Sequence, residues 1–275
     1  MLPFFGAGIG LISLGAKAMQ RHEANAFAPL LAGVLFTGFS VSILAVVFTA
    51  TRIGARSAAL RAAAPDQPWL WRPEWSAKRI PDRGSAKPIL LWVFAIFWNA
   101  MALPLVFMLA QEWPKQRNPL LLFALIFPAV GLALIVIAIY AGLRRLKFGL
   151  SACTIDNVPL RPGHTFHGEI AMRGDAVPED GYHLTLACVH RVSTGQGKSR
   201  SIEETPLWKQ ETRVSAASAR RDPAGGVRVP FSMTIPPDAR PSDFRNDRDQ
   251  IVWRLDAAAE MPGVDYAASF ELPVF

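Results

Sequence analysis

Histidines and acidic residues in the second half of the chain are the first side chains to test for metal binding or acid–base chemistry. His164 and His167 lie three residues apart in a segment that alternates like a β-strand, with Glu169 nearby. Side chains three apart on a strand point to opposite faces, so this pair cannot easily share a metal ion. His183 and His190 lie on one predicted strand and also face opposite ways. We predict no metal ligands here.

Sequence motifs for nucleophilic catalysis and nucleotide binding are missing as well. No Gly-x-Ser-x-Gly elbow occurs. Gly6 and Gly8 form a Gly-x-Gly pair, but no strand precedes it and no third glycine follows at the required offset. Glu203 and Glu204 adjoin the Gly/Ser/Lys segment 193–201, which is typical of a solvated hairpin tip. We predict no catalytic residue, no cofactor and no enzymatic activity; an enzyme with a site at the membrane face is the minor alternative.

Long uncharged segments in the first half predict membrane-spanning helices. Pro119–Leu143 has 25 residues without a charged side chain, enough to cross a hydrocarbon core of ~30 Å as a helix. We expect further spans at 26–50 and 88–110. The apolar segment 2–19 is either a fourth span or a cleaved signal peptide. Within it, Gly6 and Gly10 are spaced for close helix packing.

The segment 51–87 connects two of these predicted spans and carries eight basic and three acidic residues. Tryptophans beside a bilayer usually mark its interface. We therefore interpret this segment as an interfacial anchor whose basic side chains face anionic lipid headgroups. The alternative is a docking loop for a partner protein or for the protein's own soluble domain. The residues concerned are Trp69, Trp71, Arg72, Trp75 and Arg79.

A second basic cluster, Arg144, Arg145 and Lys147, follows the last predicted span. Basic residues beside apolar segments favour the cytoplasmic side of a membrane. Two spans separate this cluster from 51–87, so both are expected on that side. This predicts a multi-pass inner-membrane protein with a cytoplasmic C-terminal domain. The net charge of +7 therefore indicates lipid contacts rather than nucleic-acid binding, because no basic and aromatic residues alternate as in nucleic-acid-binding strands.

Asn99 is the one strongly polar residue near the middle of the predicted span 88–110. A polar group at that depth is costly unless it is paired, so we expect an interhelical hydrogen bond. The alternative is a role in permeation, which would make the protein an accessory subunit of a transporter or channel.

Hydrophobic residues alternate with a period of two from about Phe148 onward, which predicts a separate soluble domain. We expect an α+β protein with a transmembrane helical domain at 1–147 and an antiparallel β-sandwich at 148–275. Cys153 and Cys188 are expected to be buried as small hydrophobic residues. The charged segment Asp238–Asp249 is predicted to be an exposed, solvated loop, with a recognition loop as the alternative. The predicted strands are 150–156, 164–172, 182–192, 205–216, 227–235, 250–260 and 264–275.

Part of the predicted sandwich resembles the arrestin fold. The stretch Val229–Asp238 ends a strand in Ile-Pro, Pro241 and Ser242 form a Pro-Ser turn, and Ile251–Leu255 begins a strand carrying an aromatic residue. Pro162–Ile170 resembles a strand near the start of such domains. The chain departs from arrestins in having one sandwich and predicted membrane spans. The resemblance implies an interaction module rather than an enzyme.

The whole chain also resembles a group of uncharacterised bacterial inner-membrane proteins. These share a Trp-Arg-Pro-(Asp/Glu)-Trp loop, here Trp71–Trp75, and a Phe-Trp-Asn span, here Phe97–Asn99. The resemblance implies location and architecture. We therefore expect a membrane-anchored binding or scaffolding protein with an unknown protein partner, which could also form a homo-oligomer.

Overall fold

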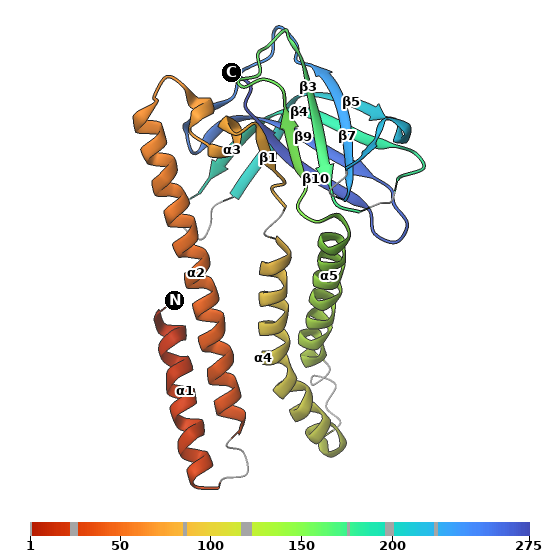
Figure 1. The fold of residues 1–275 in the computed structure, drawn as a ribbon. Helices are drawn as coiled ribbons and strands as arrows, with labels where there is room; N and C mark the ends of the chain where they lie inside the picture. The colour runs from red at the N-terminus through yellow and green to blue at the C-terminus, as the bar shows by residue number, and fades with distance from the viewer. Residues whose placement is uncertain are drawn as a thin grey trace. The chain divides into compact units, whose positions relative to one another are not determined.

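A computed structural model describes residues 2–22, 27–84, 87–116, 123–174, 177–195, 201–222 and 225–275 (Figure 1). A helical N-terminal region is followed by antiparallel β-sheets, which confirms the α+β layout. The chain divides into two compact units. The helical unit comprises Met1–Ala55 and Lys87–Ala141, and the β-unit comprises Arg56–Ala86 and Gly142–Phe275.

The four long helices overlap the predicted apolar segments, but α2 continues 13 residues beyond the predicted end at 50, and α5 begins at Ile126 rather than at Pro119. They are α1 (Leu2–Gln20), α2 (Phe27–Ala63), α4 (Lys87–Gln116) and α5 (Ile126–Phe148). Among the described residues, two helical stretches, Pro29–Ala63 and Phe123–Phe148, are long and apolar enough to cross a membrane. The apolar stretch Pro88–Leu103 is shorter.

Glycines bring α1 and α2 into close contact. A β-carbon at Gly33 would lie 2.6 Å from the backbone nitrogen of Ile12, and one at Gly15 would lie 2.6 Å from that of Leu30. Among the described residues nothing lies within 4 Å of a β-carbon at Gly6 or Gly10, so the close packing predicted for this pair is made by Gly15 and Gly33 instead. Both residues lie on a different face of the helix from Gly15.

Three consecutive residues of α4 contact two neighbouring helices. The Phe97 ring stacks on Phe39 of α2, with 3.9 Å between ring centroids. The Trp98 indole donates a hydrogen bond to the carbonyl of Phe127 at 2.9 Å. The Asn99 amide donates to the carbonyl of Gly131 in α5 at 2.9 Å and to that of Ala95 at 2.8 Å. The Phe-Trp-Asn sequence therefore joins α4 to both α2 and α5, as expected for Asn99.

Two antiparallel sheets form the β-unit (Figure 1). The first has the order β1-β2-β3-β7-β6, and the second has the order β10-β9-β4-β5, with β8 also paired to β9. The first sheet consists of β1 (Arg79–Pro81), β2 (Ala152–Ile155), β3 (Thr165–Met172), β7 (Val227–Thr234) and β6 (Arg220–Arg221). The second consists of β10 (Tyr266–Leu272), β9 (Asp249–Ala259), β4 (Tyr182–Thr194), β5 (Ser201–Val214) and β8 (Asp243–Asn246).

One hydrophobic core lies between the two sheets and makes the β-unit a sandwich. Leu184 and Leu255 contribute from the second sheet, and Ile170 and Val229 contribute from the first. This matches the predicted alternation, because inward-facing residues recur at every second position. The two cysteines are free and buried in this core, as predicted. Burial raises the pKa of Cys188 to about 11 despite the opposing charge of Arg240.

The connector, which we define as residues 65–84 between α2 and α4, is built into this sandwich. Its strand β1 pairs with β2, placing Ile80 opposite Cys153. The backbone N–H of Asp82 donates to Ser151, and the N–H of Arg83 donates to Ser269 of β10. The connector therefore joins the outer strands of both sheets on one side of the sandwich. The β-unit thus includes residues 56–86, which the sequence had suggested belonged with the helices.

The charged segment Asp238–Asp249 contains a strand, contrary to the prediction of a plain exposed loop. Residues of β8 pair with β9, and the ring of Phe244 is buried against Trp75. The charged residues on either side of Phe244 are exposed, and Phe244 is the one large apolar side chain of β8. A single apolar residue gives no periodicity from which a strand could be recognised.

Candidate functional site: an aromatic pocket beside the connector

Trp75, the last of the three tryptophans in the connector, belongs to the hydrophobic core of the β-unit. Trp75 in the short helix α3 (Pro73–Ser76) is 1% exposed, and its indole donates a hydrogen bond to the carbonyl of Glu271 at 2.9 Å. Its ring lies 5.4 Å from that of Phe244 and 6.0 Å from that of Phe275. The interpretation of Trp75 as an interfacial anchor is therefore wrong: its ring is fully covered by the sandwich. The alternative, docking onto the protein's own β-domain, describes it correctly.

Arg72 and Arg83 of the connector both form ion pairs with the buried carboxylate of Glu271. The Glu271 side chain is 3% exposed and lies 2.6 Å from Arg72 and 2.9 Å from Arg83. Both contacts are ion pairs, because within the described part of the chain neither carboxylate oxygen of Glu271 has a hydrogen-bond partner of good geometry. The guanidinium of Arg72 also lies over the Trp75 ring, at 4.6 Å. Arg72 thus connects Trp75 of the connector to Glu271 of the sandwich.

From Glu271, a chain of ion pairs continues across the second sheet. Arg191 lies 3.8 Å from Glu271 and 2.8 Å from Glu204, which in turn lies 2.9 Å from Arg254. Burial raises the pKa of Glu204, but hydrogen bonds and the positive charges of Arg191 and Arg254 outweigh this effect. The pKa of Glu204 therefore lies below its ordinary value. A carboxylate held in its charged form by two arginines suits ion pairing rather than proton transfer.

The second basic cluster also contacts the sandwich. Arg144 donates to the backbone carbonyl of Ala267. Lys147 donates to the carbonyls of Pro262 and Val264 at 2.7 and 3.0 Å, just before β10. The next residue, Phe148, is buried against Tyr266. Arg144 thus joins the end of α5 to β10, and Lys147 joins it to the β9–β10 turn. Arg145 also has an interaction partner, and Arg79 of β1 is exposed.

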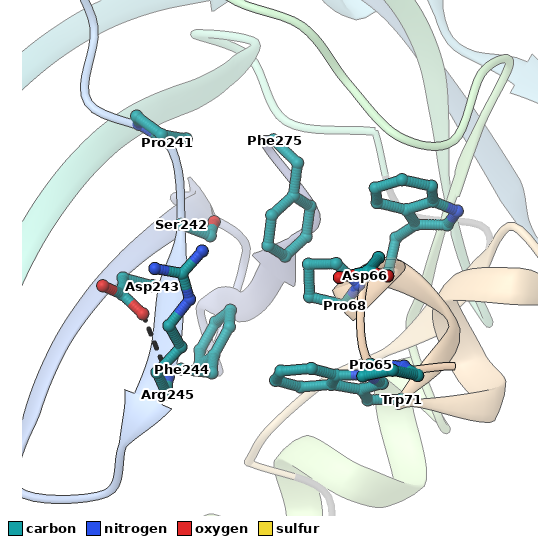
Figure 2. A pocket seen from close by; sticks show the side chains of 11 residues that line it. Pro65, Asp66, Pro68, Trp71, Pro241, Ser242, Asp243, Phe244, Arg245 and Phe275 are labelled. Carbon is teal, nitrogen blue, oxygen red and sulfur yellow. Dashed lines mark hydrogen bonds between the residues drawn. The ribbon is translucent and has the colours of Figure 1, made fainter. Parts of the chain in front are cut away.

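A cavity of about 410 Å³ opens between the start of the connector and β8 (Figure 2). Its volume lies within the usual range of ligand-binding pockets. Rings form most of its walls: in Figure 2 those of Phe244, Phe275, Trp71 and Pro68 surround the hollow. The remaining lining residues are Pro65, Asp66, Trp69, Pro241, Ser242, Asp243 and Arg245.

Polar groups without a protein partner lie among these rings. The Ser242 hydroxyl is buried, in a residue only 6% exposed, and it has no hydrogen-bond partner among the residues that the structure describes. Within the described chain, neither the Arg245 guanidinium nor the Trp69 indole N–H is engaged in a hydrogen bond or ion pair. The Trp71 indole, in contrast, donates to the carbonyl of Ala64 at 2.8 Å. Leaving a buried hydroxyl unpaired costs about 1–3 kcal/mol, so an unused group beside a cavity is a sign of a ligand site.

Two of the predicted site residues, Trp69 and Trp71, therefore line one pocket, whereas Trp75 lies in the core and the half-buried Arg72 pairs with Glu271. Sequence reasoning missed Ser242, Phe244 and Arg245, which lie some 170 residues further along the chain. The Pro-Ser turn was recognised as part of a fold pattern, but nothing in it indicated proximity to the connector. No group of three potential metal ligands occurs among the residues described.

Comparisons with known proteins leave the function open. No protein-family model matches the chain, and no curated protein matches it either. Among solved structures, Spo0M, a sporulation control protein from Bacillus subtilis, has a TM-score of 0.30 and 12% identity, over 45% of this chain and 48% of that one. The chain thus spans about half of Spo0M.

Two enzymes show smaller similarities. A β-glucosidase from Listeria innocua in complex with gluconolactone has a TM-score of 0.17 and 8% identity, over 45% of this chain and 16% of that one. AvmM, described as catalysing macrocyclization in alchivemycin A biosynthesis, has a TM-score of 0.16 and 15% identity, over 44% and 87%. All three TM-scores are below 0.5 and decide neither fold nor function. The β-sandwich assignment rests on the strand pairing and the shared core.

Proposed function

We propose that this protein is a multi-pass inner-membrane protein that presents its β-sandwich to the cytoplasm as a non-enzymatic protein-binding module, with the aromatic pocket as the binding site. The observation that carries the proposal is the pocket itself. It combines ring-lined walls with an unpaired buried hydroxyl and two unused donors. Aromatic side chains and arginine are the residues that most often dominate binding energy at protein interfaces.

The membrane assignment is supported by the exposure of the apolar helices. In each of the helical stretches Pro29–Ala63 and Phe123–Phe148, only 11% of the most apolar segment is buried. A core helix of a soluble protein would bury most of such a window, whereas a lipid-facing helix leaves it uncovered. The shorter apolar part of α4 and the helix α1 would complete four spans. The basic residues near the ends of α2 and α5 favour the cytoplasmic side for the β-unit.

The free edge of β5 is a less suitable interaction surface than the pocket. Exposed strand edges can pair with a partner strand, and Ile202 and Leu207 are exposed on this strand. However, Pro206 offers no N–H to a partner, and Lys209 lies in the middle of the strand. Proline and lysine are the residues that protect natural sheet edges against pairing.

The accessory-transporter hypothesis finds little support in Asn99. Both of its amide N–H groups donate to backbone carbonyls, one in its own helix and one in α5. These bonds give the side chain a packing role. In the described apolar parts of α2, α4 and α5, no charged side chain is available to bind a transported substrate.

Location is tested by cysteine labelling in spheroplasts. Because both native cysteines are buried, an added cysteine reports its own exposure. Arg248→Cys in the β-unit should react with a membrane-impermeant maleimide only after permeabilisation. His22→Cys, in the turn predicted to lie outside, should react without it. Labelling of Arg248→Cys in intact spheroplasts would show that the proposed orientation is wrong.

Binding is tested by site-specific photo-crosslinking in cells. A photoreactive phenylalanine analogue at Trp69 should give a discrete adduct with a second protein. The same analogue at Arg248, which is exposed outside the pocket, is the matched control. Absence of an adduct at Trp69, or the same adducts at both positions, would count against the pocket as a binding site.

A further inference from the structure

We infer that the aromatic pocket binds an extended, proline-rich peptide segment with basic flanking residues. This inference rests on the proposed function, because it assigns a ligand class to the same pocket. It follows from three properties of the lining residues: the shape of the walls, the hydrogen-bonding groups left unused, and the charges at the rim.

The walls of the pocket are flat and rigid. Indole, phenyl and pyrrolidine rings from Trp71, Phe244, Phe275 and Pro68 surround the hollow in Figure 2. Trp69 lies against Phe275, with 5.9 Å between ring centroids. Aromatic-lined grooves are the surfaces on which proline-rich segments dock, because the flat proline ring packs against them and loses little conformational entropy on binding.

Among the unused hydrogen-bonding groups of the lining, three can donate, whereas the carboxylates of Asp66 and Asp243 can only accept. The Trp69 indole and the Arg245 guanidinium can only donate, and the buried Ser242 hydroxyl has a proton to give. A matching ligand must therefore offer acceptors to the donors at the walls and donors to the carboxylates at the rim. A proline-rich backbone meets the first requirement because each proline has a carbonyl but no N–H, and the extended polyproline helix has no internal hydrogen bonds.

The rim of the pocket carries two carboxylates. Asp66 is exposed and, within the described chain, its side chain makes no hydrogen bond or ion pair. Asp243 is exposed, and among the described residues the one hydrogen bond that its side chain accepts comes from the backbone N–H of Arg245. With the Arg245 guanidinium included, the lining carries two negative charges and one positive charge, and this negative balance favours lysine or arginine next to the prolines over an acidic flank.

The test uses the full chain purified in mild detergent and isothermal titration calorimetry. The probe is a capped proline octamer with one arginine at each end. The comparison peptides are a Gly/Ser octamer with the same arginines and a proline octamer flanked by glutamates. We expect binding of the first peptide only. Equal binding of the Gly/Ser peptide, or no binding of any peptide, would overturn the inference.

Variants place the binding in this pocket. Trp69→Ala should weaken binding of the arginine-flanked proline peptide about tenfold or more, as for an aromatic anchor. Asp66→Asn should weaken it less, and the loss should shrink at high salt. Arg245→Gln should reduce binding, whereas Arg248→Gln, outside the pocket, should not. Thermal unfolding of each variant checks the fold. Unchanged affinity in both Trp69→Ala and Arg245→Gln would also overturn the inference.

Failure of the inference and failure of the proposed function can be told apart. A photo-crosslinked protein partner at Trp69 together with no affinity for any proline peptide would reject the ligand class and keep the binding module. Loss of both signals would reject the pocket as a binding site altogether.

Discussion

Replacing Trp75 by alanine should strongly destabilise the β-unit, although this residue lies between two helices in the sequence. The side chain is 1% exposed, packs against Phe244 and Phe275, and donates a hydrogen bond to the carbonyl of Glu271. Removing a large buried aromatic side chain costs about 3–5 kcal/mol, because the surrounding structure closes only part of the cavity. For a unit of this size we expect a loss of roughly 4 kcal/mol, or ~8–16 °C in melting temperature.

The assay is a urea titration of the full chain in mild detergent, read by pulse proteolysis within the sandwich. Trp92→Ala is the matched control, because Trp92 undergoes the same chemical change in α4 and is 38% exposed. It should leave the unfolding midpoint of the β-unit unchanged. A loss below about 1 kcal/mol for Trp75→Ala would refute the placement of the connector in the sandwich core, as would equal losses for the two variants.

The remaining predictions concern helix packing, thiol reactivity and pH. Gly131→Ala should lower the melting temperature of the helical unit, since its β-carbon would lie 2.4 Å from the Asn99 side-chain oxygen; Gly38→Ala, with nothing within 4 Å, should not, and equal effects would contradict this. Both cysteines should resist maleimide until the β-unit unfolds in urea, because burial raises the pKa of each thiol; mass spectrometry showing labelling of the folded protein would disprove this. Glu204→Gln should cost up to about 1 kcal/mol at pH 7 in the same titration. Since the pKa of Glu204 is lowered by Arg191, that difference should vanish as the pH falls below the usual glutamate range; a difference constant with pH would refute the ion pairing.

Period-two alternation placed most of the sandwich correctly. The predicted strand 182–192 corresponds to β4, and 227–235 corresponds to β7, because each has a continuous apolar face. Strand β1 was missed since it has only three residues, one of them Pro81, and pairs with a strand some 70 residues away. Such a short element has no pattern of its own, and only its partner makes it a strand.

The tryptophans of the connector show why the candidate site was only partly predictable. Tryptophan is favoured both at a membrane interface and in a protein core, so composition beside an apolar helix does not separate the two. Trp75 lies in the core, whereas Trp69 and Trp71 line the pocket. Distinguishing them required the position of Phe244, on the opposite wall. That contact depends on how β8 and the connector meet in three dimensions.

The long sequence separation between the connector and its partner strand has a consequence for biosynthesis. Trp75 and Glu271 are 196 residues apart. At roughly 5–20 residues per second, the ribosome needs about 10–40 s to make the intervening chain. Throughout that interval the indole and the guanidinium of Arg72 lack the strand that covers them. A nascent chain halted before β10 therefore exposes the hydrophobic side chains of the connector between α2 and α4. We expect a chaperone that binds exposed hydrophobic segments to recognise such an incomplete chain.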